Sequence, residues 1–307
     1  MANYPRTLKE FEDQFATEQA CRAYLEKLRW PTGFCCPRCQ GRRAVRIRAV
    51  LLQCYACRRQ TSVTAGTIFQ DTRKPLGMWF RAMWYVTSQT NGASALRIQH
   101  VLGLGSYETA WTWLHKLRRI MIQPEQDRLS GWIEVDEAFV NVAGPKKANK
   151  ALVVIAAQTD GGGIGQIRMR AIPDASAASL HGFVLDSIAP GSTLHTEGWQ
   201  GYVGLDKKGY HQEVHYGRSQ GPSQLMPRVY KVALLLKGWL AGLHQGAVSA
   251  EHLPYYLDEF TFRFNRRRSK GRGKLFLRLL QQAAHTPLAA GHTPVEPSEP
   301  HRGAFRP

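Results

Sequence analysis

The sequence predicts an α/β protein in which a mixed sheet with flanking helices follows a cysteine-rich ribbon and a helical segment. Three observations support this class. Two CxxC pairs lie within residues 31–68, and residues 72–124 combine helical spacing with many aromatic side chains. From residue 130 onward, short β-branched runs alternate with longer helical patterns, as expected for a sheet with helices packed on it.

These patterns predict five segments. They are N-terminal helices over 1–30, a ribbon over 31–68, a helical domain over 72–124, an α/β core over 130–283 and a Pro-rich, disordered tail over 284–307. Apolar side chains recur at near-helical spacing over residues 6–29, and Thr17 interrupts them. Because the pattern is interrupted at Thr17 and restarts at Glu18, we expect two short helices there.

Composition indicates the partner more clearly than the fold. The chain has 307 residues, of which 43% are hydrophobic, and a formal net charge of +18. The apolar content is enough for real cores, and the charge indicates an anionic partner. Double-stranded DNA is the leading candidate, a membrane surface the second, and a basic protein without such a partner the third.

No signal-peptide pattern opens the sequence, and no apolar run approaches the roughly 18–20 residues that span a bilayer. We therefore expect a cytoplasmic protein. Thiols stay reduced in that compartment, so clustered cysteines favour a metal site over disulfides.

The cysteine pairs are Cys36-Pro-Arg-Cys39 and Cys54-Tyr-Ala-Cys57, with fourteen residues between them. Two CxxC turns at such a spacing are typical of tetrahedral zinc. The alternatives are a redox pair and unrelated structural cysteines. A four-sulfur site has no open coordination position, so the predicted zinc is structural and not catalytic.

The helical domain contains a helix, a turn around Gly103-Leu-Gly105, and a second helix that Ser106 would cap. This arrangement resembles a helix-turn-helix whose second helix enters the major groove. An ordinary packed helical hairpin is the alternative. The candidate DNA-binding residues on this helix are Ser106, Tyr107, Thr109, Lys116, Arg118 and Arg119.

The core is predicted from its strand and helix patterns. Strands are expected over 132–140, 151–157, 164–172 and 192–197, and helices over 176–188, 229–243 and 252–267. Asp136 lies in the first strand and Glu197 ends the fourth. Tyr230 and Lys237 lie seven residues apart, nearly two turns, on one side of a helix. An RNase H-like fold places acids in this way to bind two Mg²⁺ ions for phosphodiester chemistry.

With these motifs in order, the chain resembles insertion-sequence transposases of the ISXO-like DDE family, from about residue 8 to residue 284. The resemblance rests on FCCPRC…CYAC, TAGTIFQDTRKPLGMWF, SYETAWTWLHKLR, IEVDEAFV, LHTEGWQGY, PRVYKVALLLKGWLAG and HLPYYLDEFTFRFNRRRS. It implies a zinc ribbon, an RNase H-like core and binding of terminal inverted repeats. It also implies cleavage and transfer of DNA strands with Mg²⁺ or Mn²⁺, and at least a dimer on the DNA.

By position, the resemblance implies that Asp136 and Glu197 bind the catalytic metal and that Lys237 contacts DNA phosphate. Relatives have Asp at the position of Glu197, His, Asn or Glu at that of Tyr230, and Thr at that of Ala138. Glu keeps the charge but adds a methylene, whereas a phenol is a poor Mg²⁺ ligand at neutral pH. An altered but active enzyme, a decayed copy and a domesticated DNA-binding descendant all agree with these departures.

A basic run over residues 262–278 contains eight Lys or Arg and no acid. Interleaved apolar residues are expected to pack on the core while the charges face outward to DNA phosphate; a solvated helix end is the alternative. The candidate contacts are Arg263, Arg266, Arg267, Arg268 and Lys270.

These motifs and the resemblance therefore predict a DDE-type transposase that is associated with the bacterial nucleoid. The alternative is a catalytically impaired descendant that binds DNA. A protein that binds membrane surfaces is the least supported alternative, because the sequence predicts no basic amphipathic helix separate from the core.

Overall fold

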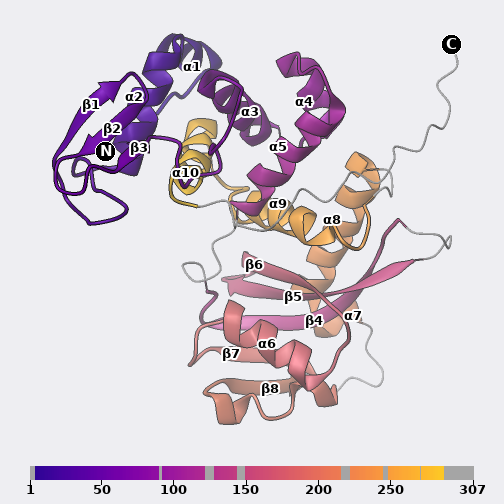
Figure 1. Cartoon of the computed structure of the whole chain (residues 1–307). Helices are drawn as coiled ribbons and strands as arrows, with labels where there is room; N and C mark the ends of the chain where they lie inside the picture. Colours follow the sequence, from indigo (N-terminus) through magenta and orange to yellow (C-terminus); the bar gives the residue numbers. More distant parts are fainter. Residues whose placement is uncertain are drawn as a thin grey trace, which may run out of the picture. The chain divides into compact units, whose positions relative to one another are not determined.

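The computed structural model describes residues 4–89, 92–121, 128–143, 149–215, 222–244, 248–269 and 271–286. The chain forms two compact units (Figure 1): Met1–Ile120 with Ser269–Pro307, and Met121–Arg268. Most of the tail predicted to be disordered, from residue 287 onward, lies outside the described residues. Within those ranges, no helix is long and apolar enough to cross a bilayer.

The first unit begins with two short helices, α1 (Leu8–Gln14) and α2 (Glu18–Arg29). Thr17 caps α2, since its hydroxyl oxygen accepts a hydrogen bond of 3.2 Å from the amide of Ala20. The two helices expected on either side of Thr17 are therefore confirmed. A three-stranded antiparallel sheet follows in the order β1 (Ala44–Arg48), β2 (Leu51–Cys54) and β3 (Gln60–Ser62).

Three helices complete the N-terminal part of this unit: α3 (Leu76–Ser88), α4 (Ala95–Leu102) and α5 (Tyr107–Arg119). The turn between α4 and α5 has the geometry expected from the sequence. Gly103 adopts a left-handed conformation with φ 62°, which ends α4 without steric cost. Ser106 caps α5 by accepting a hydrogen bond of 3.1 Å from the amide of Thr109.

The C-terminal helix α10 (Arg272–His285) belongs to the first unit, because it packs against α3 and α2. The ring of Phe276 lies 5.4 Å from that of Phe11 and 5.7 Å from that of Trp84. Gly273 passes so close to the N-terminal segment that a Cβ atom there would lie 1.7 Å from the carbonyl oxygen of Pro5. The sequence analysis assigned these residues to the core over 130–283; the aromatic cluster of the first unit is where their apolar side is buried.

The second unit is built on a five-stranded mixed sheet (Figure 1). Its strands are β4 (Trp132–Asn141), β5 (Lys150–Asp160), β6 (Gly163–Ile172), β7 (Thr193–Glu197) and β8 (His211–His215), in the spatial order β6-β5-β4-β7-β8. β4, β5 and β6 are antiparallel, whereas β7 and β8 run parallel to β4. The predicted mixed sheet is confirmed. β8 is an additional strand that the sequence analysis did not predict.

Helices cover both faces of this sheet. On one face α6 (Ala177–Ser187) packs over Ile133, Val135 and Leu194, together with the buried ring of Tyr202. On the other face α8 (Pro227–His244) and α9 (Leu253–Asn265) pack over β4, β5 and β6. Shorter segments are α7 (Pro222–Leu225), η2 (Gln200–Tyr202) and η3 (Asp206–Lys208).

A buried carboxylate fixes the start of α8 on the sheet. Glu134 of β4 is 4% exposed. It accepts hydrogen bonds of 2.7 and 3.0 Å from the amides of Arg228 and Val229, and the Arg228 guanidinium donates another of 2.7 Å. The first amides of a helix have no partner within the helix and carry partial positive charge. Glu134 therefore neutralises both the helix end and the arginine.

We expect Glu134→Gln to lower the free energy of unfolding by about 2–4 kcal/mol, because the neutral amide leaves the Arg228 charge without its buried partner. Asp160→Asn is the matched control, since its ion pair with Arg268 is 56% and 67% exposed on the two side chains. Such a pair contributes about 0–1 kcal/mol. Urea unfolding at pH 7 measures both. Equal losses in the two variants would contradict the assigned role of Glu134.

Candidate active site and metal centre

The two CxxC pairs form turns with the same backbone geometry. In the first, the amide of Gln40 donates to the carbonyl oxygen of Cys36 at 3.0 Å. In the second, the amide of Arg58 donates to that of Cys54, also at 3.0 Å. Gln40 and Arg58 both adopt left-handed conformations, with φ of 60° and 61°. The chain thus folds each pair back so that its sulfurs point to a common centre.

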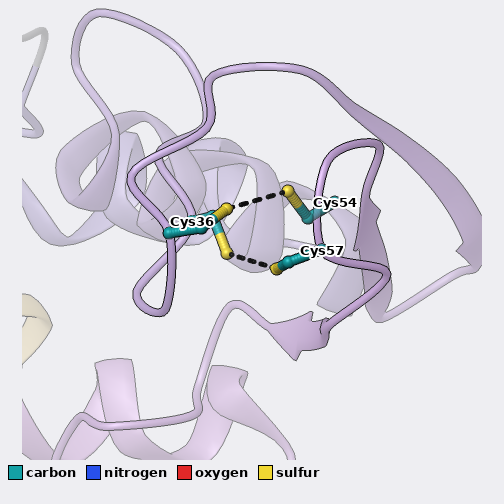
Figure 2. A group of neighbouring side chains, drawn as sticks. Cys36, Cys54 and Cys57 are labelled. Carbon is teal, nitrogen blue, oxygen red and sulfur yellow. Dashed lines mark hydrogen bonds between the residues drawn. The ribbon is translucent and has the colours of Figure 1, made fainter.

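The four sulfurs lie close enough for one ion. Cys36 and Cys57 are 3.6 Å apart, and Cys39 and Cys54 are 3.7 Å apart, measured between Sγ atoms; Figure 2 shows these two pairs facing each other. All four Sγ atoms lie within 4.8 Å of one another. Four sulfurs bound to tetrahedral zinc at 2.3 Å are about 3.8 Å apart. The cluster therefore fits a closed, structural zinc site.

The surroundings also fit thiolate ligands. A Cβ atom at Gly41 would lie 3.3 Å from the sulfurs of both Cys39 and Cys54, so glycine leaves the space that an ion and its ligands need. Hydrogen bonds from the amides of Cys39 and Arg38 lower the pKa of Cys36 to about 6, whereas hydrogen bonds with the neighbouring sulfurs raise that of Cys39 to about 12, so Cys36 is the first of these two thiols to ionise. A thiolate is the form that binds metal.

The second site combines two acids from neighbouring parallel strands. β4 pairs with β7 in a register that sets Glu134 opposite His195. Asp136 and Glu197 each lie two residues further along their strands, so they stand at the same level and on the same face of the sheet. That face is opposite to the one covered by α6. The sequence analysis selected both residues, and the sheet places them side by side.

The charge of Asp136 is poorly compensated. Burial raises the pKa of its carboxyl to about 7, and the negative charges of Glu197, Glu137 and Glu134 add to this effect. One backbone amide, that of Glu137, donates a hydrogen bond of 2.8 Å to Asp136 but is not enough to offset the burial. Two carboxylates so placed favour a cation between them, because Mg²⁺ and Mn²⁺ prefer oxygen ligands.

Two residues that the sequence analysis did not select hold the segment after Glu197. The Tyr202 hydroxyl donates a hydrogen bond of 2.5 Å to Glu137 on β4, and the Trp199 indole donates one of 2.7 Å to the carbonyl oxygen of Ala175. The sequence signal for Glu137 was its position directly after Asp136. Tyr202 has no comparable signal, because its burial of 1% exposure depends on the tertiary fold.

Gly201 lies at the closest approach in this segment. A Cβ atom there would be 2.6 Å from the carbonyl oxygen of Ala175 and 2.8 Å from Cδ1 of Leu180. Real Cβ atoms do not come so near to backbone. Glycine is therefore required at position 201 if the chain is to leave β7 toward Tyr202.

The two candidate residues on α8 lie near one edge of that helix. Tyr230, 41% exposed, directly follows Val229, whose amide is bound by Glu134. The anchor therefore sets Tyr230 in the first turn, beside the strand that bears Asp136. Lys237 is exposed nearly two turns later. Among the described residues, no hydrogen bond or ion pair joins either side chain to Asp136 or Glu197.

The candidate DNA-binding residues of α5 differ in accessibility. Arg118 is 1% exposed and its Nη2 atom lies 3.4 Å from the carbonyl oxygen of Ala93, so it is not available to DNA in this structure. The Ser106 hydroxyl is engaged as the N-cap. Tyr107 is 37% exposed. Thr109, Lys116 and Arg119 are half-buried.

The basic run at the end of α9 also departs from the expectation that its charges all face outward. Arg263 is 14% exposed in its side chain and forms an ion pair of 2.7 Å with the fully buried Glu259. The charge of Arg263 is therefore paired within α9 and does not face outward. The guanidinium of Arg266 instead lies over the ring of Phe262, 4.2 Å from its centroid.

The next two arginines are exposed but also contact the β5–β6 hairpin. Arg267 donates hydrogen bonds to the carbonyl oxygens of Gly165, at 3.1 Å, and of Ile164. Arg268 pairs with Asp160 at 2.6 Å. Both keep their charge at the surface. Lys270 lies outside the described residues.

The geometry thus defines a protein with a cysteine zinc ribbon and a carboxylate pair on a mixed sheet. Family models match both parts: the ISXO2-like transposase domain over residues 128–265 and the transposase zinc-ribbon domain over residues 16–60. The chain therefore combines an ISXO2-like transposase domain with a transposase zinc ribbon.

Two further comparisons were found. An uncharacterized protein in transposable element ISH50 of Halobacterium salinarum is 23% identical over 278 residues, which cover 81% of this chain and 91% of that protein. A chain in the cryo-EM structure of the simian T-cell lymphotropic virus intasome with PP2A regulatory subunit B56 gamma is 14% identical. That match covers 71% of this chain and 80% of the other, with a TM-score of 0.31, and supports no argument about fold or function.

We expect Gly201→Ala to destabilise the second unit by about 2–4 kcal/mol, because the added methyl group must displace backbone. Gly182→Ala in α6 is the matched control: a Cβ atom there meets nothing within 4 Å, and alanine in a helix gains up to about 1 kcal/mol over glycine. Urea unfolding followed by circular dichroism distinguishes them. A loss for Gly201→Ala no greater than the effect of Gly182→Ala would refute the packing argument.

Asp136→Asn is expected to stabilise the folded protein more at pH 8 than at pH 5. The raised pKa means that folded Asp136 binds a proton more tightly than unfolded Asp136. The contribution of Asp136 to wild-type stability therefore falls as pH rises from about 4 to about 7 and is level above that. Asparagine does not titrate. The increase in the free energy of unfolding caused by Asp136→Asn should therefore be larger at pH 8 than at pH 5 by on the order of 2 kcal/mol. Unfolding without added divalent ions measures it.

Asp186→Asn is the control for this pH dependence, since Asp186 forms an exposed ion pair with Arg170. Its effect should be small at both pH values. An Asp136→Asn effect that is the same at pH 5 and pH 8 would contradict a raised pKa.

Proposed function

We propose that this transposase binds the terminal inverted repeats of an insertion sequence and catalyses metal-dependent cleavage and transfer of DNA strands. The observation that supports this most strongly is the position of Asp136 beside Glu197 on one face of the sheet. Metal-dependent phosphodiester chemistry uses carboxylates that meet at one site. The excess of positive charge over the chain supports a nucleic-acid substrate.

The sheet supports an RNase H-like assignment of the core. Numbered along the core, its strands stand in the order 3-2-1-4-5, with the first three antiparallel and the last two parallel to the first. Asp136 is on the first of these strands and Glu197 at the end of the fourth. These are the positions that the family resemblance assigns to its first two acids.

In this proposal Asp136 and Glu197 hold Mg²⁺ or Mn²⁺. The bound metal would act as a Lewis acid and lower the pKa of water. The chain's own residues orient these groups. Glu134 fixes α8, Tyr202 binds Glu137 beside Asp136, and Gly201 allows the turn after Glu197. Lys237, exposed on α8, would bind a DNA phosphate near the scissile bond.

DNA recognition is proposed for α4 and α5 as a helix-turn-helix-like pair. The exposed ring of Tyr107 and the basic side chains of Lys116 and Arg119 are the contacts we assign to α5. Arg267 and Arg268 add charge at the end of α9. A dimer on DNA is proposed as well, because two ends of an element must be held together.

A catalytically impaired descendant that binds DNA is the second candidate. It is favoured by the residues around the acids. Glu197 is longer by a methylene than the Asp that the family pattern has, and Tyr230 offers a phenol where a ligand is expected. Ala138 follows Asp136 on the same face, packed against the α8 core, where relatives have Thr.

The test is cleavage of a labelled duplex that carries the element's terminal repeat, with Mg²⁺ or Mn²⁺. If the enzyme is active, wild type nicks at the repeat end. Asp136→Asn then loses at least about a hundredfold in rate, as expected for removal of a metal ligand, while its binding to the duplex in a mobility-shift assay stays within about twofold.

The outcomes separate the two candidates. Binding without cleavage, restored by Glu197→Asp with Tyr230→His, would identify an impaired enzyme. Binding without cleavage in that double variant as well would identify a repurposed DNA-binding protein. Absence of salt-sensitive, repeat-specific binding would contradict both candidates, because each requires the duplex contacts.

A further inference from the structure

A second group of possible metal ligands lies outside the cysteine ribbon and the carboxylate pair. His195 of β7 and Glu213 and His215 of β8 each offer one ligand atom, and these atoms lie within 4.8 Å of one another. His195 Nδ1 is 2.8 Å from His215 Nε2, and His195 Nε2 is 3.6 Å from Glu213 Oε2. The two imidazole rings are nearly parallel, 14° apart.

The register of the sheet accounts for this cluster. β7 pairs with β8 in parallel, so that His195 is opposite Glu213 and Glu197 is opposite His215. Alternate residues of a strand share a face, which sets all four side chains on the face that also bears Asp136. β8 alternates between exposed and half-buried residues, and Glu213 and His215 are among the exposed ones.

The donor set suits zinc rather than magnesium. Imidazole nitrogen with one carboxylate is typical of zinc and similar transition ions, whereas Mg²⁺ takes oxygen ligands. Bonds of about 2.0–2.2 Å in a tetrahedron set donor atoms about 3.3–3.6 Å apart. Only one ring nitrogen of His195 can bind the ion, and the three donor atoms, one from each residue, lie within 4.8 Å of one another, so side-chain rotations bring them into that range.

The surroundings of these three side chains also suit a bound metal ion. The Trp132 ring lies 4.8 Å from the ring of His195, which limits its rotation. Side-chain exposures of 17% for His195 and 46% for Glu213 leave a path for an ion from solvent. With three protein ligands, one tetrahedral position would remain for water or a further group, unlike the closed four-sulfur site.

We infer that His195, Glu213 and His215 bind a zinc-type divalent ion that links the edge strand β8 to β7. The bound ion joins residues twenty positions apart in the chain and stabilises a five-residue strand that has a neighbour on one side. This site does not depend on the proposed DNA chemistry. It also differs in ligand type from the carboxylate pair.

The test is the zinc content of the full chain, loaded with zinc at pH 7.5, passed through gel filtration and measured by mass spectrometry of the metal. Wild type should retain a second zinc equivalent beyond that held by the cysteines. His195→Ala and Glu213→Gln should each lose that equivalent and keep the cysteine-bound one. Glu213→Gln replaces an exposed side chain by an isostere, so the test remains decisive if the histidine variant does not fold.

Two controls assign the second equivalent. His211→Ala removes an exposed histidine of β8 outside the cluster and should retain it. Asp136→Asn should retain it too, because the carboxylate pair is a separate site. Wild type that holds only the cysteine-bound zinc, or a second equivalent that survives both His195→Ala and Glu213→Gln, overturns the inference. Loss of the second equivalent in Asp136→Asn alone would assign it to the carboxylate pair and also overturn the inference.

Discussion

The parallel pairing of β4, β7 and β8 is the constraint on which both ligand groups of the second unit depend. Parallel strands that pair in register place residues at the same level and on the same face of the sheet, however far apart those residues are in the chain. Glu134, His195 and Glu213 form one such row, and Asp136, Glu197 and His215 belong to the next. A shift of one residue in either pairing would turn the polar side chains of the shifted strand to the α6 face. Burial of the apolar residues under α6 therefore also fixes the strand register that aligns the polar residues.

Three carboxylates of β4, Glu134 and Asp136 on one face of the sheet and Glu137 on the other, show how the fold distributes charge. Glu134 is neutralised by Arg228 and by the first amides of α8, and Glu137 is bound by the Tyr202 hydroxyl. Asp136, between them, has one backbone amide. Glu134 thus binds α8 and Glu137 binds the segment after β7, whereas the charge of Asp136 is offset only in part by that one amide. A buried charge of this kind is costly unless a cation accompanies it.

Local chemistry was readable from the sequence, whereas long-range partners were not. The CxxC spacing, the helix break at Thr17, and Asp136 and Glu197 at strand positions all follow from near neighbours in the chain. β8 was not predicted, because HQEVH lacks apolar alternation and is a strand only through its pairing with β7. Arg118 looked like a surface charge, yet it is buried against Ala93. Arg263 has a buried partner one turn earlier in its own helix, but its burial depends on how α9 lies on β6.

The return of α10 to the first unit has a consequence for synthesis. Phe276 completes the aromatic cluster around Phe11, and Gly273 packs against Pro5, so the core of the first unit needs residues more than 260 positions apart. Domains generally fold as their own residues emerge from the ribosome; here the first unit lacks part of its core until α10 has been synthesised. A truncated nascent chain would expose that aromatic cluster, and a prematurely terminated product would present apolar surface to chaperones and proteases instead of a finished domain.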